Sequence, residues 1–161
     1  LTRAQYSNGT VIDYAYDDEG NLILRTKISD SSYTEYTWDH RNRLTNGTDK
    51  DSMGSATRSA DYSYDLYDRR IKKVVDLDGA GGGGSVTTRY VCEDQGITRV
   101  VLQFDGSSNI THRYLHGPAV DQLLADEDSS NNLLALCIAE LFATHASVLI
   151  AHVPVKSHAC R

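Results

Sequence analysis

A short unit that begins with two aromatic residues and an aspartate recurs along the chain. It occupies residues 14–22, 36–44 and 62–71, and each copy contains tyrosine, a small residue, a second aromatic residue and aspartate in that order. The second aromatic residue falls at positions 16, 38 and 64, in steps of 22 and 26 residues, and the third copy is one residue longer or slipped. Weaker echoes follow at residues 90–94 and 104–106. Such spacing indicates repeated supersecondary units that pack on their neighbours.

Each copy predicts the first strand and the turn of a β-hairpin. Alternate residues of a strand face the same side, so the two aromatic residues share a face and the small residue lies opposite. The aspartate can accept hydrogen bonds from the backbone N–H groups that follow it, as in an Asx turn. Three residues later comes Gly20 or Asn42, types that tolerate a positive φ. An apolar residue then begins the return strand.

We therefore expect an all-β fold in which hairpins follow one another as an antiparallel meander. Turn-forming residues lie between the copies at the spacing of hairpin loops. Gly79 to Gly84 is interpreted as an insertion in one such loop, because repeat-like sequence resumes after it. The predicted strands are residues 10–16, 21–28, 33–38, 43–48, 57–64, 69–76, 86–92, 98–104 and 109–115.

Composition narrows the classes of partner. The chain has 161 residues, enough for one domain, with 16 Lys+Arg against 22 Asp+Glu and a net charge of −6. No basic surplus is available to neutralise phosphates, so no nucleic-acid partner is expected. Ten tyrosines against two phenylalanines and one tryptophan favour half-buried sheet surfaces. The redox state of Cys92, Cys137 and Cys160 stays open, and no signal peptide is visible.

The tyrosine–aspartate units resemble the YD repeats of the RHS family, which includes bacterial RHS proteins, insecticidal Tc toxins and animal teneurins. The run from Arg113 to Gln122, Arg-Tyr-Leu-His-Gly-Pro-Ala-Val-Asp-Gln, is similar to the motif that closes many bacterial RHS cores. The resemblance covers roughly residues 6–127. Three features depart from it: the chain has only about four repeats, it lacks an Asp-Pro self-cleavage motif, and the pattern stops after Glu127.

The resemblance implies a long β-sheet that spirals into a hollow shell, often around a C-terminal toxin domain, in a secreted or cell-surface protein. The implied partners are neighbouring YD repeats of a longer parent chain, and a toxin domain or a carbohydrate. The residues that carry the repeat in this chain would be structural rather than catalytic. They are Tyr14, Tyr16, Asp17, Gly20, Tyr36, Trp38, Asp39, Tyr62, Tyr64, Asp65, Tyr114, Gly117 and Pro118.

The composition changes abruptly near residue 128, so the chain is divided into a repeat region, 1–127, and a divergent tail, 128–161. Residues 133–151 are nearly all apolar or small, without glycine or proline, and predict a helix capped by Asn131 or Asn132. Glu140 lies near its middle, where a charge opposes membrane insertion, so a helix packed on protein is preferred to a membrane span. A poorly folded remnant is the third alternative.

No catalytic, cofactor or metal site is expected. His112 and His116 have metal-binding spacing only on a helix, yet they lie in strand-like sequence. The ligand types in residues 152–160 lack a further partner nearby, and residues 76–79 lack the later ligands of a calcium loop. Neither a G-x-S-x-G motif nor a phosphate-binding loop occurs.

The preferred function is a non-catalytic structural scaffold, part of a YD-repeat shell. The alternative is a carbohydrate- or cell-surface-binding module whose exposed tyrosine faces stack on sugar rings. A scaffold is favoured if the face that carries the tyrosines is also the face that packs in the core, and a binding module is favoured if that face is exposed. By parity, Tyr14, Tyr16, Leu22, Leu24 and Ile28 can share one face, which favours the scaffold.

Overall fold

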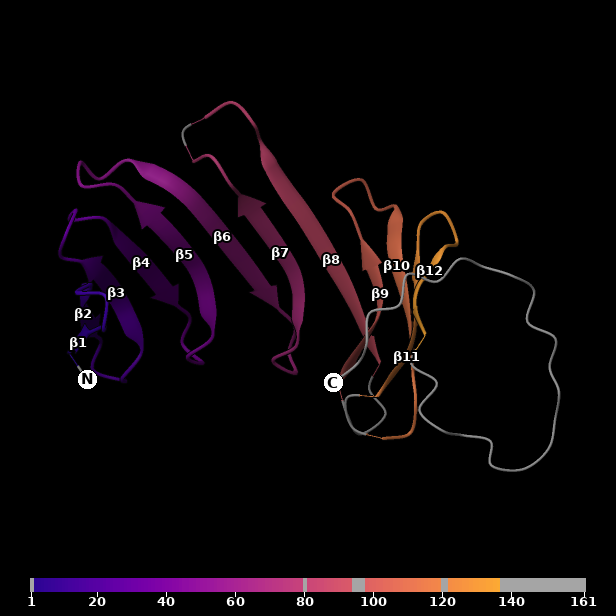
Figure 1. Ribbon diagram of the computed structural model, residues 1–161. Helices are drawn as coiled ribbons and strands as arrows, with labels where there is room; N and C mark the ends of the chain where they lie inside the picture. Colours follow the sequence, from indigo (N-terminus) through magenta and orange to yellow (C-terminus); the bar gives the residue numbers. More distant parts are fainter. Residues whose placement is uncertain (1, 80, 94–97, 120–121, 137–161) are drawn as a thin grey trace, which may run out of the picture. The chain divides into compact units, whose positions relative to one another are not determined.

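The fold is all-β, and every strand pairs antiparallel with its neighbour in the sequence. The computed structural model describes residues 2–79, 81–93, 98–119 and 122–136, and their twelve strands form one sheet in the order β1 to β12 (Figure 1). The strands are β1 (Arg3–Gln5), β2 (Val11–Tyr16), β3 (Leu22–Lys27), β4 (Tyr33–Trp38), β5 (Leu44–Lys50), β6 (Ala56–Tyr64), β7 (Arg70–Asp76), β8 (Ser85–Glu93), β9 (Arg99–Phe104), β10 (Ile110–His116), β11 (Leu123–Asp128) and β12 (Leu133–Leu136).

The predicted meander is confirmed, and the nine predicted strands correspond to β2 through β10 with ends displaced by at most two residues. Three strands were not predicted. β1 has only three residues, too few for a periodic pattern, and β11 (Leu-Leu-Ala-Asp-Glu-Asp) lacks the aromatic unit that marks the other hairpins.

The helix prediction is wrong where the structure describes it. Leu133–Leu136, the first predicted helical turn, is strand β12, and Ala135 pairs with Asp126 of β11. A tight turn from Asp128 to Asn132 reverses the chain, so backbone pairing with β11 overrides the helical propensity of leucine and alanine. Residues 137–151 lie outside the described residues. No described helix has the length and apolar character of a membrane span.

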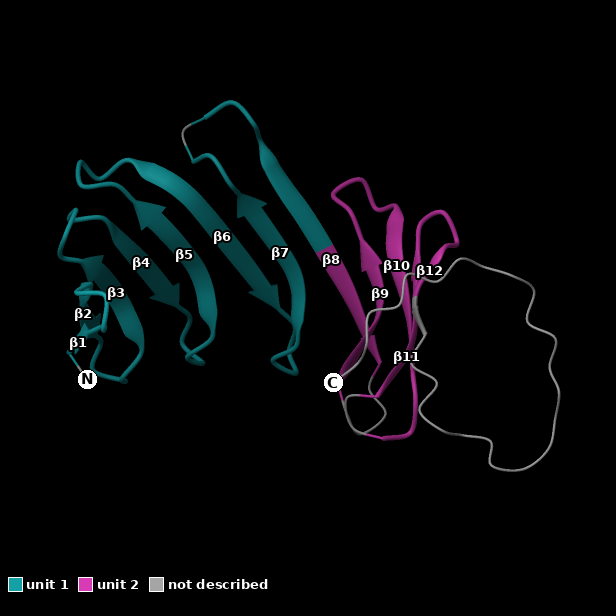
Figure 2. Cartoon of the chain, in the orientation of Figure 1, with its two compact units in different colours: residues 1–88 teal, residues 89–161 magenta. Residues whose placement is uncertain are grey.

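The chain divides into two compact units, Leu1–Thr88 and Arg89–Arg161 (Figure 2). Unit 1 contains β1 to β7 and the start of β8, and unit 2 contains the rest of β8 and β9 to β12. The division between residues 127 and 128 remains a prediction about the sequence pattern.

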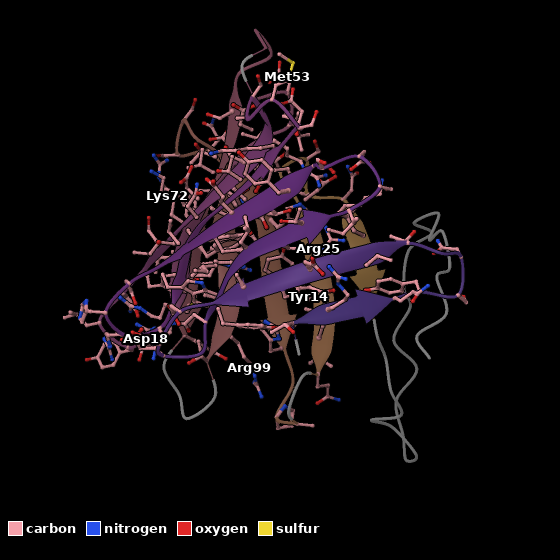
Figure 3. All side chains as sticks on the ribbon, turned by 90° about the vertical axis from the view of Figure 1, so that its left-hand side faces the viewer. Tyr14, Asp18, Arg25, Met53, Lys72 and Arg99 are labelled. Atoms are coloured by element: carbon pink, nitrogen blue, oxygen red, sulfur yellow. The ribbon has the colours of Figure 1, made fainter. Side chains whose placement is uncertain are left out.

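Very little of the described chain is buried. Ile12, with 3% of its surface exposed, is the buried hydrophobic residue, and Thr34, at 9%, is the buried polar one. Both lie in unit 1 on β2 and β4. All described strands belong to the same sheet, and most side chains are partly exposed. Figure 3 draws these side chains on the ribbon. Strand pairing and contacts within the sheet, rather than a thick apolar core, therefore stabilise this fold.

Candidate functional site

The repeated unit forms the same structure in each copy at the end of a strand. Tyr16, Trp38 and Tyr64 are the last residues of β2, β4 and β6, and in each strand the pairing register shifts just before that residue. Such an irregularity is a β-bulge, which bends the strand and re-aims the side chain that follows. The three aromatic residues thus occupy equivalent positions immediately before a turn.

The re-aimed aromatic side chain bonds to the preceding hairpin. The indole Nε1 of Trp38 donates a hydrogen bond of 2.9 Å to the carbonyl oxygen of Leu22, at the start of β3. The phenol of Tyr64 donates to the carbonyl oxygen of Leu44, at the start of β5, at 2.8 Å. Because each donor reaches back one hairpin, only an aromatic residue with a polar atom at its tip provides both the packing and the link.

An aspartate closes each of the three turns. Asp39 Oδ1 accepts hydrogen bonds from the backbone N–H groups of Arg41 and Arg43 at 2.9 and 3.0 Å, and its Oδ2 accepts one from Arg43 Nε at 2.7 Å. Asp65 binds the N–H groups of Tyr67 and Arg69 in the same way, at 2.9 and 3.0 Å. The turn is completed by backbone bonds between its first and fifth residues, for example Asp39 N–H to the Arg43 carbonyl at 3.0 Å.

The fourth residue of each turn has a positive φ. It is 88° at Gly20, 57° at Asn42 and 64° at Asp68. Glycine, asparagine and aspartate are the residues that reach this region most easily. The third copy is therefore not slipped: Asp68 takes the position of Asn42, and Arg70 begins β7 as Leu44 begins β5.

Side chains connect neighbouring turns into a ladder along one edge of unit 1. Asn21 Nδ2 donates to Asn42 Oδ1 at 3.0 Å, which joins the first turn to the second. Arg41 and Arg43 bind the two carboxylate oxygens of Asp68 at 2.7 and 2.8 Å, which joins the second to the third. Arg43 also donates to the carbonyl oxygen of Asp65 at 3.0 Å. The edge of unit 1 is thus cross-linked from hairpin to hairpin.

The same turn occurs at three further aspartates, of which Asp105 lies in the predicted weaker echo at residues 104–106. Asp51, Asp105 and Asp128 each bind the N–H groups two and four residues later, and each turn has a positive φ at its fourth residue. A sequence signal was present, because each of these aspartates precedes a glycine, serine or asparagine by three residues. None of the three aspartates follows a complete aromatic pair, so the aromatic pattern did not predict a full copy of the unit at these turns.

The run that resembles the closing motif ends its strand as the repeated unit does, although Gly117 stands where the unit has aspartate. β10 ends with Tyr114, Leu115 and His116, again with a register shift before the last residue. His116 Nε2 donates to the carbonyl oxygen of Val100 on the preceding strand, β9, at 2.8 Å, as Trp38 does in unit 1. In the loop that follows, Arg99 donates to the carbonyl oxygens of Gly117 and Ala119 at 2.8 and 2.9 Å.

Gly117 is buried, and a Cβ atom there would lie 2.1 Å from Oε1 of Gln122, so the glutamine side chain would have to move. Pro118 is exposed in the same loop.

The ion pairs of the turns depress the pKa of their aspartates. The Arg43 side chain, with smaller contributions from backbone N–H groups, holds the pKa of Asp39 at about 2. Hydrogen bonds from the side chains of Asn21, Asn109 and Asn132 lower the pKa of Asp17, Asp105 and Asp128 respectively. The charged form of each aspartate is thus favoured in the folded state.

These pKa values predict acid sensitivity. A carboxyl with a folded pKa below its unfolded value contributes stability above the unfolded pKa, near 4, and loses it as pH falls through the folded pKa. The free energy of unfolding is therefore expected to be flat from about pH 6 to 5 and to decline between about pH 4 and 2. Urea unfolding at a series of pH values measures it. Asp39→Asn retains an acceptor for the backbone N–H groups but removes the titration, so its decline should be shallower than that of the wild type.

A decline of equal steepness in Asp39→Asn would contradict the role of the Asp39–Arg43 pair. Asp18→Asn is the matched control, because Asp18 lies in the first turn with its side chain exposed.

The first tyrosines of the three units lie on one face of unit 1, named here the tyrosine face. Directly paired residues of adjacent strands point to the same side. Tyr14 pairs with Arg25, Arg25 with Thr34, Thr34 with Asp49, and Asp49 with Arg58, so these residues form one row across five strands. Figure 3 labels Tyr14 and Arg25 on their neighbouring strands. A second row contains Tyr36, Gly47, Ala60 and Val75, and a third contains Tyr62 and Lys73.

The prediction that Leu24 shares a face with Tyr14 and Tyr16 is wrong. Leu24 pairs with Ala15, not with a tyrosine, so it lies on the opposite face. The turn between β2 and β3 sets a register in which even-numbered residues pair with odd-numbered ones, for example Tyr14 with Arg25. Even-numbered residues therefore share a face within one strand, but even-numbered residues of the two strands joined by this turn lie on opposite faces. Ile12 and Thr34, the buried residues of unit 1, do lie on the tyrosine face.

The described residues include His112 and His116, the histidines whose spacing was considered for a metal site. No group of three or more His, Cys, Asp or Glu residues in that part of the chain is arranged to hold a metal ion. His112 Nδ1 lies 2.9 Å from Asp126 Oδ1, and its ring stacks on Tyr114 with centroids 5.6 Å apart. His116 bonds to a backbone carbonyl instead, so the structure does not bring the two histidines to a shared ligand position. Residues 152–160 lie outside the described residues.

Comparisons with known proteins give a distant similarity. The chain matches no protein-family model. It is 28% identical over 151 residues to the tRNA nuclease WapA of Bacillus subtilis strain 168, covering 73% of this chain and 6% of that protein. It is 27% identical over 159 residues to the tRNA3(Ser)-specific nuclease WapA of Bacillus spizizenii, covering 78% of this chain and 6% of that protein.

This chain is similar to a small part of WapA. It spans about 6% of the length of the curated relatives that it matches.

Proposed function

We propose that this chain is a non-catalytic structural segment of a repeat-sheet scaffold. The observation that carries the proposal is the ladder in unit 1, in which each hairpin is hydrogen-bonded to the next through Trp38, Tyr64 and the turn side chains. These links use side chains that a catalytic or binding site would otherwise need free. A sheet whose strands lie side by side in chain order can also be lengthened by further hairpins without rearrangement of the existing ones.

The similarity to a small part of two much larger proteins supports the same proposal. A segment of this kind would pair with neighbouring repeats of a longer secreted or cell-surface chain. There the extended sheet would form a wall around a toxin domain, as the resemblance to RHS proteins implies. Neither a nucleic acid nor a membrane is needed for this role.

The proposal predicts coupling between neighbouring hairpins. Asp68→Asn keeps a residue that tolerates positive φ but removes the carboxylate bound by Arg41 and Arg43. Amide hydrogen exchange should become several-fold faster in the turn 39–43 as well as in the turn 65–69, because both lose the same contact. The matched control is Asp18→Asn, an exposed turn aspartate. Faster exchange confined to residues 65–69 would contradict a mechanically coupled scaffold.

A screen of the full chain against ester, phosphoester, glycoside and peptide substrates tests the absence of catalysis. No turnover above buffer is expected. A turnover abolished by one substitution, for example at His112, the residue paired with Asp126, would overturn the proposal.

A further inference from the structure

The two faces of unit 1 carry opposite charge. Among paired residues of β2 to β7, the tyrosine face has four cations and one carboxylate: Arg25, Lys27, Arg58 and Lys73, with Asp49. The opposite face has four carboxylates and two cations: Asp13, Glu35, Asp61 and Asp76, with Lys50 and Lys72. Arg70 pairs with Tyr64 beyond the register shift of β6 and is counted on neither face. The net charge of −6 does not reveal this difference, because it sums the charges of both faces and of the rest of the chain. A local cationic surface attracts an acidic partner even on an acidic protein.

A hollow of about 330 Å³ lies in the tyrosine face. Gly47 and Ala60, paired across β5 and β6, form a floor without long side chains, and Tyr36, Tyr62 and Leu77 are among the lining residues. The side chain of Arg58 lines the hollow and pairs with Asp49 at 2.6 Å. Aromatic and aliphatic walls around a small-residue floor suit one apolar side chain of a partner.

Arg58 and Lys73 flank this hollow along the strand direction. On β6, Arg58, Ala60 and Tyr62 are alternate residues of one face, and Lys73 on β7 pairs directly with Tyr62. Alternate residues of a strand are about 6.7 Å apart. Along the strand direction, a cation therefore lies about that far from the floor of the hollow on each side, and Lys73 is also one strand further across the sheet.

We propose that the tyrosine face of unit 1 is a docking surface for an extended, acidic polypeptide segment with the alternation acidic–x–apolar–x–acidic. An extended chain presents every second residue to one side at the same spacing as β6 itself. Its apolar side chain would enter the hollow over Gly47 and Ala60, and its two carboxylates would meet Arg58 and Lys73. Arginine and lysine clusters commonly recognise acidic peptide motifs in this way.

The chemistry of the hollow favours a peptide over other anions. The hollow between Arg58 and Lys73 has apolar walls and a small-residue floor, which leave the middle of a uniformly charged phosphate chain without a partner but accept an apolar side chain. This docking role goes beyond the scaffold function and is independent of it, because the ladder lies at the strand ends and does not use Arg58 or Lys73.

The test uses fluorescence anisotropy with the full chain and a short labelled peptide in which two glutamates flank a tryptophan at alternate positions. Lys73→Gln is expected to weaken binding about tenfold, and Lys72→Gln, the neighbouring lysine on the opposite face, by less than about twofold. A peptide with glutamines for the glutamates, and one with alanine for the tryptophan, should each bind about tenfold more weakly.

Far-ultraviolet circular dichroism of both variants verifies that the sheet is intact. Equal losses in Lys73→Gln and Lys72→Gln, or no saturable binding of the peptide, would overturn the proposal. So would tighter, Lys73-dependent binding of polygalacturonate or of an oligouridine, because the surface would then recognise an anionic sugar or a nucleic acid. Amide exchange at the turns reports on the scaffold separately, so failure of one proposal leaves the other distinguishable.

Discussion

Trp38→Ala is expected to lower the free energy of unfolding by about 3 kcal/mol. The substitution removes the largest side chain of the chain from its half-buried place at the end of β4, and it removes the hydrogen bond from Nε1 to the Leu22 carbonyl. That carbonyl belongs to the preceding hairpin, so β2–β3 and β4–β5 are both expected to lose stability. Because Trp38 is the single tryptophan, urea unfolding should be followed by far-ultraviolet circular dichroism rather than by its fluorescence.

Two further substitutions separate packing from hydrogen bonding. Trp38→Phe keeps a ring and loses the donor, so a cost of about 1 kcal/mol is expected. Tyr64→Phe removes the equivalent bond to Leu44 and should cost a similar amount. Tyr67→Ala is the control, because Tyr67 is an aromatic residue with 70% of its surface exposed. A loss for Trp38→Ala no greater than that for Tyr67→Ala would contradict the equivalence of the repeated units.

Gly79→Ala is expected to destabilise unit 1 by about 3 kcal/mol. Gly79 has a φ of +58°, and a Cβ atom there would lie 2.0 Å from the carbonyl oxygen of Ala56, at the start of β6. The obstacle is backbone, which cannot rotate away as a side chain can. Its own N–H donates to Asp76 Oδ1 at 2.9 Å, so moving the residue to relieve the clash would break a turn contact.

Gly82→Ala provides the matched control, since Gly82 belongs to the same glycine-rich loop and a Cβ atom there meets nothing within 4 Å. Thermal unfolding of the two variants should differ by roughly 10 °C or more for a domain of this size. Equal midpoints would show that the loop relaxes freely around Gly79, contrary to the tight approach to Ala56.

The repeated unit determined much of this fold by itself. Aromatic alternation, the turn aspartate and a residue tolerant of positive φ all act within a few residues of one another, and local hydrogen bonds decide their structure. The strand ranges from 10–16 to 109–115 and the antiparallel order therefore follow from sequence alone. The residues at the strand ends, such as Trp38 and Asp39, could be identified for the same reason.

Pairing between strands decided the rest. Leu133–Leu136 has helix-forming residues, yet it is a strand because β11 offers backbone partners that no local pattern records. Leu24 lies opposite the tyrosines because the turn sets the register, and a shift of one residue exchanges the two faces of a strand. The bond from Trp38 to Leu22, the bridge from Arg43 to Asp68 and the hollow over Gly47 and Ala60 join residues far apart in the chain. The sequence by itself determined where strands and turns form, because these depend on interactions between neighbouring residues. Only the tertiary structure decided which face each side chain occupies and which hairpin it binds, because both depend on the register of strand pairing.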